Sequence, residues 1–142
     1  MPTRLALARP LAAAVLAAAF AGCIPMATLP DEGPLRPSGL TFSLEPENSV
    51  AGAPISPGVA VTVLYNTGDT AFVSTATISL SIELGTGNPK ARLHGDTVQA
   101  AVNGTAMFSN VSIDSAGAGY RLIASSNGLG AAQSDAFDVA HP

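Results

Sequence analysis

The chain has 142 residues, a formal net charge of −4 from six basic and ten acidic side chains, and a single cysteine. This length suits one domain. An acidic chain without clusters of Lys or Arg is a poor ligand for nucleic acid and does not adhere electrostatically to anionic lipid, so both function classes are disfavoured.

Residues 1–22 predict an export signal. The stretch "MPTRLALARP" carries Arg4 and Arg9 and no acid, and the apolar run "LAAAVLAAAF" comes directly after it. A membrane-spanning helix needs about 20 apolar residues, whereas this run has about ten, so the pattern favours a signal peptide over a spanning anchor. We expect the protein to leave the cytoplasm.

The signal can end at two sites. The stretch "FAGC", which ends at Cys23, resembles the lipobox of bacterial lipoproteins, although Phe20 stands where that family usually has Leu. The resemblance implies cleavage before Cys23, diacylglycerol on its sulfur and acylation of the new amino group. The rival is the A-x-A site "AFA", at which ordinary signal peptidase would leave Gly22 first and a free thiol. A lone exposed thiol in an oxidising compartment invites intermolecular pairing, which favours the lipoprotein.

The lipobox also has consequences for location. Two or three acyl chains, at about 0.8 kcal/mol per buried methylene, would anchor the protein firmly to a membrane. Ile24, and not Asp, stands after the cysteine, which by analogy with the sorting of enteric lipoproteins implies the outer membrane. Secretion into the surroundings is the alternative if cleavage occurs after Ala21.

Residues 23–39 are expected to be the lipidated cysteine and a proline-rich tether. After Cys23 comes "IPMATLPDEGPLRPSG", which holds four prolines and two glycines and no periodic apolar run. Proline-rich segments favour polyproline II at about 3.1 Å per residue, so this stretch can hold a domain up to roughly 50 Å from the lipid. An unstructured leader without a spacing role is the other interpretation.

Residues 40–140 predict a β-sandwich. Apolar and polar residues alternate in "LTFSLEP", "VAVTVLYN" and "TISLSIEL", which is typical of half-buried strands, and turn-forming groups such as "NTGDT" and "GTGNPK" separate these runs. Asn103 and Gly104 between two apolar strands indicate a type I′ hairpin. We expect an all-β fold, an antiparallel sandwich of about seven strands. The predicted apolar face of the third run consists of Ile78, Leu80, Ile82 and Leu84.

This region also resembles one copy of a bacterial immunoglobulin-like repeat of the invasin-like, Big type. The likeness rests on "LTFSLEPENSVAGAPISPGVAVTV", on "AAVNGTAMFSNVSIDSAGAGYRLIASSNGL" and on the closing "SDAFDV". It implies an immunoglobulin-like sandwich. Such repeats serve in surface proteins as rigid spacers, as adhesive tips or as accessory modules of exported enzymes.

A corner motif is the most informative part of that likeness. In "DSAGAGYRL", which begins at Asp114, the chain turns through Gly117 and Gly119 and then enters a strand at Tyr120. This resembles the tyrosine corner of immunoglobulin-like sandwiches, in which the hydroxyl bonds back to the backbone a few residues upstream. Leu122 stands where antibody domains have a cysteine, so apolar packing replaces a disulfide. A structural role of Tyr120 is favoured over stacking against a ligand.

Three residues are candidates for ligand contact. The repeats commonly have an Asp near the end of the second strand, whereas this chain has "LYNTGD", with Leu64 and Tyr65 at that place. An exposed Leu64 beside Tyr65 is either a contact patch or a replaced turn residue, and we favour the latter. Sugar-binding sandwiches use exposed aromatic rows, for which Tyr65 and Phe72 are the candidates.

Catalytic and metal-binding patterns are weak. His94 and His141 do not have a metal-ligand spacing, and the sequence lacks a G-x-S-x-G elbow and a P-loop. We therefore expect no enzyme and no cofactor. Carboxylates near the strand ends could bind calcium weakly, but solvated turn acids are the favoured interpretation. These carboxylates belong to Glu45, Glu47, Asp69, Asp96 and Asp114.

Together these features predict a non-enzymatic cell-envelope lipoprotein that presents an immunoglobulin-like domain as a spacer or as an adhesion module. The expected partners are a membrane, through the lipid anchor, and a protein or glycan ligand at the cell surface, with no nucleic acid. One alternative is a carbohydrate-binding module, and another is a truncated fragment of a multi-repeat surface adhesin.

Overall fold

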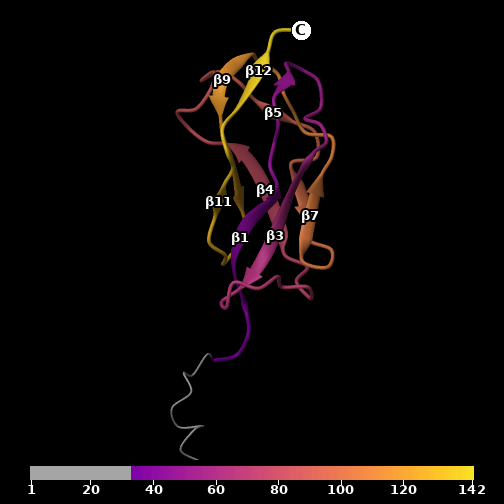
Figure 1. Ribbon diagram of the computed structural model, residues 1–142, viewed down its shortest axis with the longest axis vertical. Coiled ribbons are helices and arrows are strands. Elements are labelled where there is room, and N and C mark those ends of the chain that lie inside the picture. The colour runs from indigo at the N-terminus through magenta and orange to yellow at the C-terminus, as the bar shows by residue number, and fades with distance from the viewer. Residues whose placement is uncertain (1–32) are drawn as a thin grey trace, which may run out of the picture. The chain divides into compact units, whose positions relative to one another are not determined.

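The computed structural model describes residues 33–142, so the predicted signal peptide, Cys23 and most of the tether lie outside the described residues. The described part contains strands and no helix (Figure 1). The strands are β1 (Pro37–Leu44), β2 (Ser49–Val50), β3 (Val59–Tyr65), β4 (Thr77–Ile82), β5 (Leu93–His94), β6 (Val98–Ala100), β7 (Thr105–Phe108), β8 (Ser112–Ile113), β9 (Gly117–Tyr120), β10 (Leu122–Ser125), β11 (Ala132–Gln133) and β12 (Phe137–Ala140).

Two main sheets form the body of the domain. One has the order β1-β3-β7 and the other the order β11-β10-β4-β6, and all their pairings are antiparallel. Two smaller sheets, β2-β12-β9 and β5-β8, lie toward the C-terminal end, and β2 pairs with β12 in parallel (Figure 1). The predicted all-β sandwich is confirmed, although it is divided into more and shorter strands than the seven expected.

Strand β3 is the most deeply buried strand of the described chain. Val59, Val61 and Val63 are fully buried and face the core, as their alternation predicts. The intervening Thr62 is buried too, because β1 and β7 flank β3 on both sides. Each flanking strand places a hydroxyl group next to the Thr62 hydroxyl. The Thr62 Oγ1 donates a hydrogen bond to Ser43 Oγ at 2.9 Å and lies 3.0 Å from Thr105 Oγ1.

The Asn-Gly turn is present but links two different sheets. Asn103 and Gly104 both have positive φ, 52° and 82°, as a type I′ turn requires. Val102 and Thr105 exchange backbone hydrogen bonds of 2.9 and 3.1 Å. Beyond this bridge the strands separate, since β6 pairs with β4 and β7 pairs with β3. The turn therefore carries the chain from one layer of the sandwich to the other.

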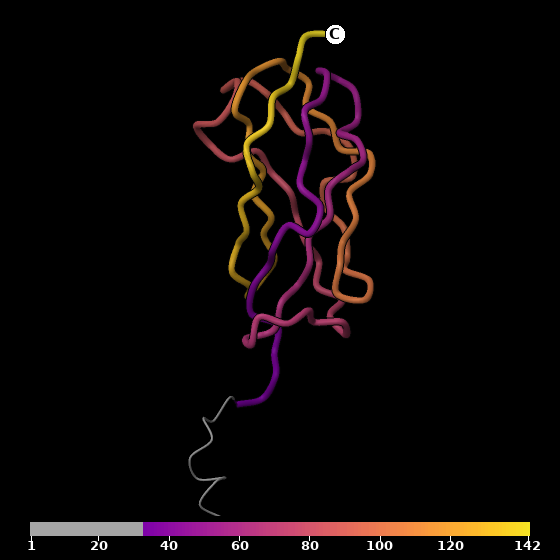
Figure 2. The backbone as a smooth tube through the Cα atoms, in the orientation of Figure 1, coloured from indigo at the N-terminus to yellow at the C-terminus, as the bar shows by residue number. Residues whose placement is uncertain are grey.

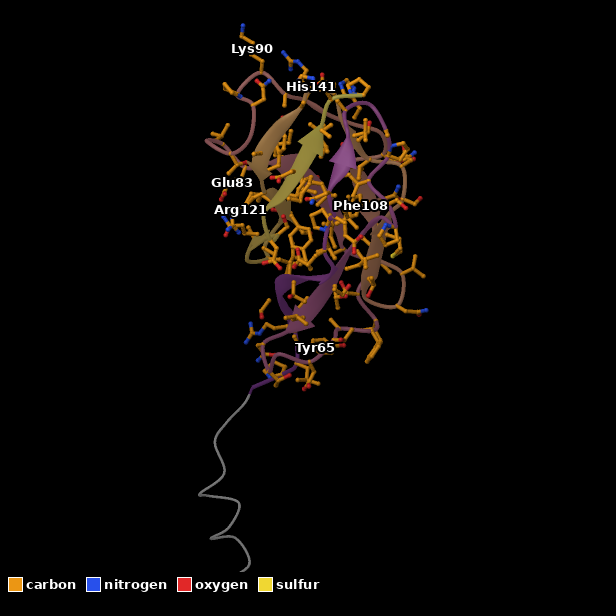
Figure 3. All side chains as sticks on the ribbon, turned by 45° about the horizontal axis from the view of Figure 1, so that its top comes forward. Tyr65, Glu83, Lys90, Phe108, Arg121 and His141 are labelled. Carbon is orange, nitrogen blue, oxygen red and sulfur yellow. The ribbon has the colours of Figure 1, made fainter. Side chains whose placement is uncertain are left out.

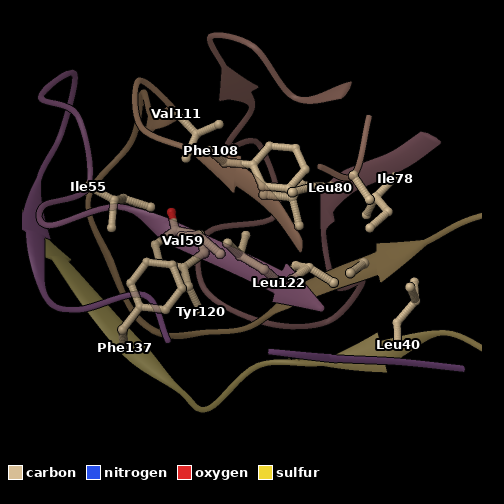
Figure 4. Packing of buried hydrophobic residues seen from close by; sticks show 14 of the residues in the cluster. Leu40, Ile55, Val59, Ile78, Leu80, Phe108, Val111, Tyr120, Leu122 and Phe137 are labelled. Atoms are coloured by element: carbon tan, nitrogen blue, oxygen red, sulfur yellow. The ribbon is translucent and has the colours of Figure 1, made fainter. Parts of the chain in front are cut away.

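The core lies between the layers and is mostly aliphatic. Its aromatic members are Phe108, Tyr120 and Phe137, and the chain has no tryptophan. Figure 4 shows Tyr120 and Phe137 beside each other at one end of the core and Leu40 at the far end. Within the described residues, the buried members of this cluster lie between Leu40 and Val139.

Two expectations about strand limits are wrong. Strand β1 begins at Pro37 and not at Leu40, because Pro37 and Gly39 already pair with the end of β3. The predicted apolar face of the third run does not extend to Leu84, whose side chain is 96% exposed. Strand β4 ends at Ile82, and the chain then turns away from the sheet.

Candidate functional site

The predicted lipidation site is not part of the described structure. The structure describes the chain from residue 33 onward, and Cys23, the export signal and the cleavage sites all precede that residue. Among the described residues no helix is long and apolar enough to cross a membrane. The lipid anchor is therefore an inference from the sequence.

The tyrosine corner is well formed. Tyr120 is fully buried, and its hydroxyl donates a hydrogen bond of 2.7 Å to the backbone carbonyl oxygen of Ser115. Its ring lies 6.0 Å from that of Phe137, at an interplanar angle of 33°. Gly119 has a φ of +74° and donates its N–H to Asp138 Oδ1 at 2.8 Å. The hydrogen bond expected from the sequence is present, and it closes the chain between β8 and β9.

Two glycines make room for the tyrosine ring. A methyl group at Gly117 would lie 3.1 Å from the Tyr120 hydroxyl and 3.0 Å from the backbone nitrogen of Asn88. A methyl group at Gly87 would overlap the Tyr120 ring itself. The motif "DSAGAGYRL" contains Gly117 but not Gly87, because the contact of Gly87 with Tyr120 brings together residues far apart in the chain. Only the folded structure reveals this second requirement for glycine.

Asp114 joins the corner to the short strand β5. Its Oδ1 accepts hydrogen bonds of 2.9 Å from the backbone N–H of Arg92 and from the Ser115 hydroxyl, and its Oδ2 lies 3.1 Å from His94 Nε2. The Arg92 N–H, followed by His94 and Ser115, lowers the Asp114 pKa from 3.8 to about 2, since these donors favour the charged carboxylate. Asp114 thus has a structural role, since its hydrogen bonds connect the corner to β5 and to the residue before it.

The three candidate ligand contacts do not form one exposed row. Leu64 is not a turn residue, because it lies within β3, is half-buried and pairs with Gly39 and Thr70. Tyr65 is also half-buried and packs against the core. Phe72 is different, since 68% of it is exposed on the loop after β3. An aromatic row for stacking sugar rings is therefore absent from these positions.

Further exposed apolar side chains accompany Phe72. Val73 is 81% exposed and Val102, beside the Asn-Gly turn, is 70% exposed, while Leu35, just before β1, is 60% exposed. We call Leu35, Phe72, Val73 and Val102 the tether-side patch. Leu35, Val73 and Val102 were not predicted as contact residues, because isolated apolar residues in turn-rich segments carry no periodic signal.

The rest of the described surface offers shallow depressions. The one nearest the C-terminus has a volume of about 450 Å³ and is lined by residues that include Asn48, Gly117, Asp138 and His141. Residues 33–142 contain no group of three or more His, Cys, Asp or Glu side chains placed to share a metal ion. The scattered loop acids therefore do not converge on one site within this part of the chain.

Comparison with known proteins gives little more. No protein-family model matches the sequence, and no curated protein matches it either. Among solved structures, the chain is similar to a β-glucuronidase from Parabacteroides merdae, with a TM-score of 0.47 and 20% sequence identity. The match covers 75% of this chain and 12% of the enzyme's chain. So distant and partial a likeness carries no functional argument.

Proposed function

We propose that this protein is a non-enzymatic lipoprotein of the cell envelope, anchored through Cys23, that holds one immunoglobulin-like sandwich above a membrane as a spacer or interaction module. The signal, the lipobox-like "FAGC" and the proline-rich tether support the anchor. The outer membrane is the proposed location, by the sorting analogy that Ile24 suggests.

The arrangement of the chain ends is the observation that favours a spacer. The described chain enters the sandwich at one end, where Arg36 accepts a backbone hydrogen bond of 3.0 Å from Asn66. It leaves at the opposite end, past the β2–β12 pair (Figure 2). Figure 3 shows Tyr65 near the first end and Lys90 and His141 near the second. Because the chain enters and leaves at opposite ends, the length of the sandwich separates its C-terminal end from the end that joins the tether (Figure 2).

The interaction role remains part of this proposal, with a protein or glycan as the ligand. Glycan binding through an aromatic row has less support, because Tyr65 packs against the core whereas the Phe72 side chain is exposed. The two rings therefore do not form one exposed row. A binding surface formed by loops is compatible with the sandwich, because rigid sheets hold such loops in fixed positions. Cross-linking on intact cells, followed by mass spectrometry, would identify the partner.

The anchor is tested by labelling cells that express the full chain with a radioactive fatty acid. Wild-type protein should incorporate the label, begin at Cys23 and partition into detergent, whereas Cys23→Ser should lose the label because the acylated sulfur is gone. Phe20→Leu is the matched control, since it restores the usual lipobox residue and should keep the label. An unmodified wild-type chain that begins at Gly22 and stays soluble would overturn the proposal.

A further inference from the structure

We propose that the tether-side patch rests on the lipid surface to which the tether leads, so that the sandwich stands on the membrane with this end down. The inference rests on the proposed lipid anchor and adds an orientation and a contact surface to it. Three independent features of the described residues support it: the clustering of apolar side chains, the distribution of charge and the point of chain entry.

The patch is held together by backbone contacts between two segments. Val63, near the end of β3, donates its N–H to the Gly104 carbonyl at 2.7 Å and accepts a hydrogen bond of 2.8 Å from Ala71. A methyl group at Gly104 would overlap the Ala71 carbonyl, so the hairpin lies directly against the loop. Phe72 and Val73 on the loop and Val102 on the hairpin consequently belong to the same end of the domain.

The loop also presents its side chains outward in a defined conformation. Ser74 donates its N–H to the Ala71 carbonyl at 2.8 Å, and Phe72 donates its N–H to the Thr70 carbonyl at 3.0 Å. These bonds turn the chain tightly around Phe72 and Val73, which point away from the core and remain mostly exposed. Phe72 and Val73 are adjacent and both mostly exposed, so with Val102 at the same end they form the apolar contact surface of the proposal.

The charges of the domain are distributed unequally along its length. The segments that build the tether-side end, residues 33–37, 64–76, 100–105 and 126–131, carry the ionisable side chains of Arg36, Asp69 and Tyr65, so their formal charge is balanced. Elsewhere in the described chain acids outnumber bases. The acids there are Glu45, Glu47, Glu83, Asp96, Asp114, Asp135 and Asp138, and the bases are Lys90, Arg92 and Arg121.

This distribution favours one orientation above a bilayer. A lipid surface with anionic headgroups repels the part of the domain in which acids outnumber bases. It does not repel the tether-side end, whose formal charge is zero. Phe, Val and Leu side chains gain free energy when they enter the boundary between headgroups and acyl chains. Both effects direct the same end toward the membrane.

The tether places that end near the lipid. The described chain enters beside Arg36, and an extended chain spans at most about 3.6 Å per residue, so the stretch from Cys23 to Gly33 reaches no farther than about 36 Å. Contact by a few apolar side chains is weak for a free protein. Attachment at Cys23 raises their effective concentration at the surface, which lets the weak contact form. The patch should thus bind lipid only when the chain is tethered.

The chain itself provides a clean assay, because it has one cysteine and no tryptophan. The chain from Cys23 to Pro142 is coupled through its thiol to a maleimide lipid in vesicles of phosphatidylethanolamine and phosphatidylglycerol. Phe72→Trp introduces one indole into the patch, and Leu84→Trp introduces one on the exposed loop after β4. Emission is compared between vesicles with ordinary and with brominated acyl chains.

We expect the Phe72→Trp chain to shift its emission to shorter wavelength on coupling and to lose intensity in brominated vesicles, while the Leu84→Trp chain does neither. Val102→Trp, on the hairpin, should repeat the result and serves if Phe72→Trp does not fold. Equal quenching at positions 72 and 84, or quenching at neither, would overturn the inference. A shift that occurs without vesicles and grows with protein concentration would assign the patch to a second copy instead.

This readout is separate from the test of the anchor. Chemical coupling places the chain on the vesicle whether or not cells acylate Cys23, so absence of the fatty-acid label would refute the lipoprotein and leave the vesicle result unaffected. Conversely, a labelled protein whose patch indole is not quenched would keep its anchor and lose the proposed contact. Uncoupled Phe72→Trp chain mixed with the same vesicles measures the contribution of the tether.

Discussion

Replacing Tyr120 by phenylalanine tests whether the corner stabilises the domain. The substitution removes the hydroxyl that donates 2.7 Å to the Ser115 carbonyl and leaves the buried ring in place against Phe137. Because the ring volume is conserved, cavity formation contributes little, and the lost hydrogen bond dominates. A neutral intramolecular hydrogen bond contributes about 1 kcal/mol, and an unpaired buried carbonyl adds to the loss.

The expected effect is large enough to measure by urea unfolding of the Cys23–Pro142 chain. With a slope of about 2 kcal/mol per molar, a loss of about 1 kcal/mol lowers the urea midpoint by about 0.5 M. The melting temperature should fall by about 4 °C for a domain of this size. The slope itself should not change, since the same surface is exposed on unfolding.

Tyr65→Phe is the matched control, because it removes the same atom from the other tyrosine. Tyr65 is half-buried, and its hydroxyl makes no hydrogen bond within the described part of the chain. Its removal should therefore leave the midpoint nearly unchanged. Equal midpoints for Tyr120→Phe and the wild type, or equal losses for the two variants, would refute the role given to the corner.

Three further predictions concern the surroundings of the corner and the loops. Gly87→Ala should unfold at a much lower urea concentration than wild type, since its methyl group overlaps the Tyr120 ring. Gly128→Ala, also at positive φ but with open space around it, should lose only about 1 kcal/mol of stability, the cost of a left-handed backbone for an L-residue. Similar losses for the two variants would contradict the packing account. Because the folded Asp114 pKa is lowered to about 2, its contribution to stability is fully present above pH 3.8 and is lost as pH falls through about 2. The stability advantage of wild type over Asp114→Asn should therefore disappear as pH falls across that window. The melting temperature should be the same, within a degree or two, in excess calcium and in excess chelator, because a native-state ligand raises it by mass action, and a rise of many degrees with calcium would reveal a metal site.

The sequence determined the class of fold because the relevant signals are local. Alternation in "VAVTVLYN" gives β3 one apolar face whatever its neighbours are, and Asn103-Gly104 can adopt the two positive φ angles of a type I′ turn with little strain. The hydrogen bond from the Tyr120 hydroxyl to the Ser115 carbonyl also joins residues close in the sequence, so the motif "DSAGAGY" contains both donor and acceptor. The predicted lipid anchor at Cys23 depends on the sequence alone.

Tertiary structure decided what depends on contacts between distant segments. The strands on either side of Asn103-Gly104 join different sheets, because their partners β4 and β3 lie in opposite layers. Leu84 continues the alternation of β4 but is exposed, since β4 ends at Ile82 and a turn follows it. The tether-side patch exists only because the loop of Phe72 and the hairpin of Val102 meet at Val63. Side-chain alternation is a property of neighbours in sequence, whereas burial and surface clustering depend on which segments the fold brings together.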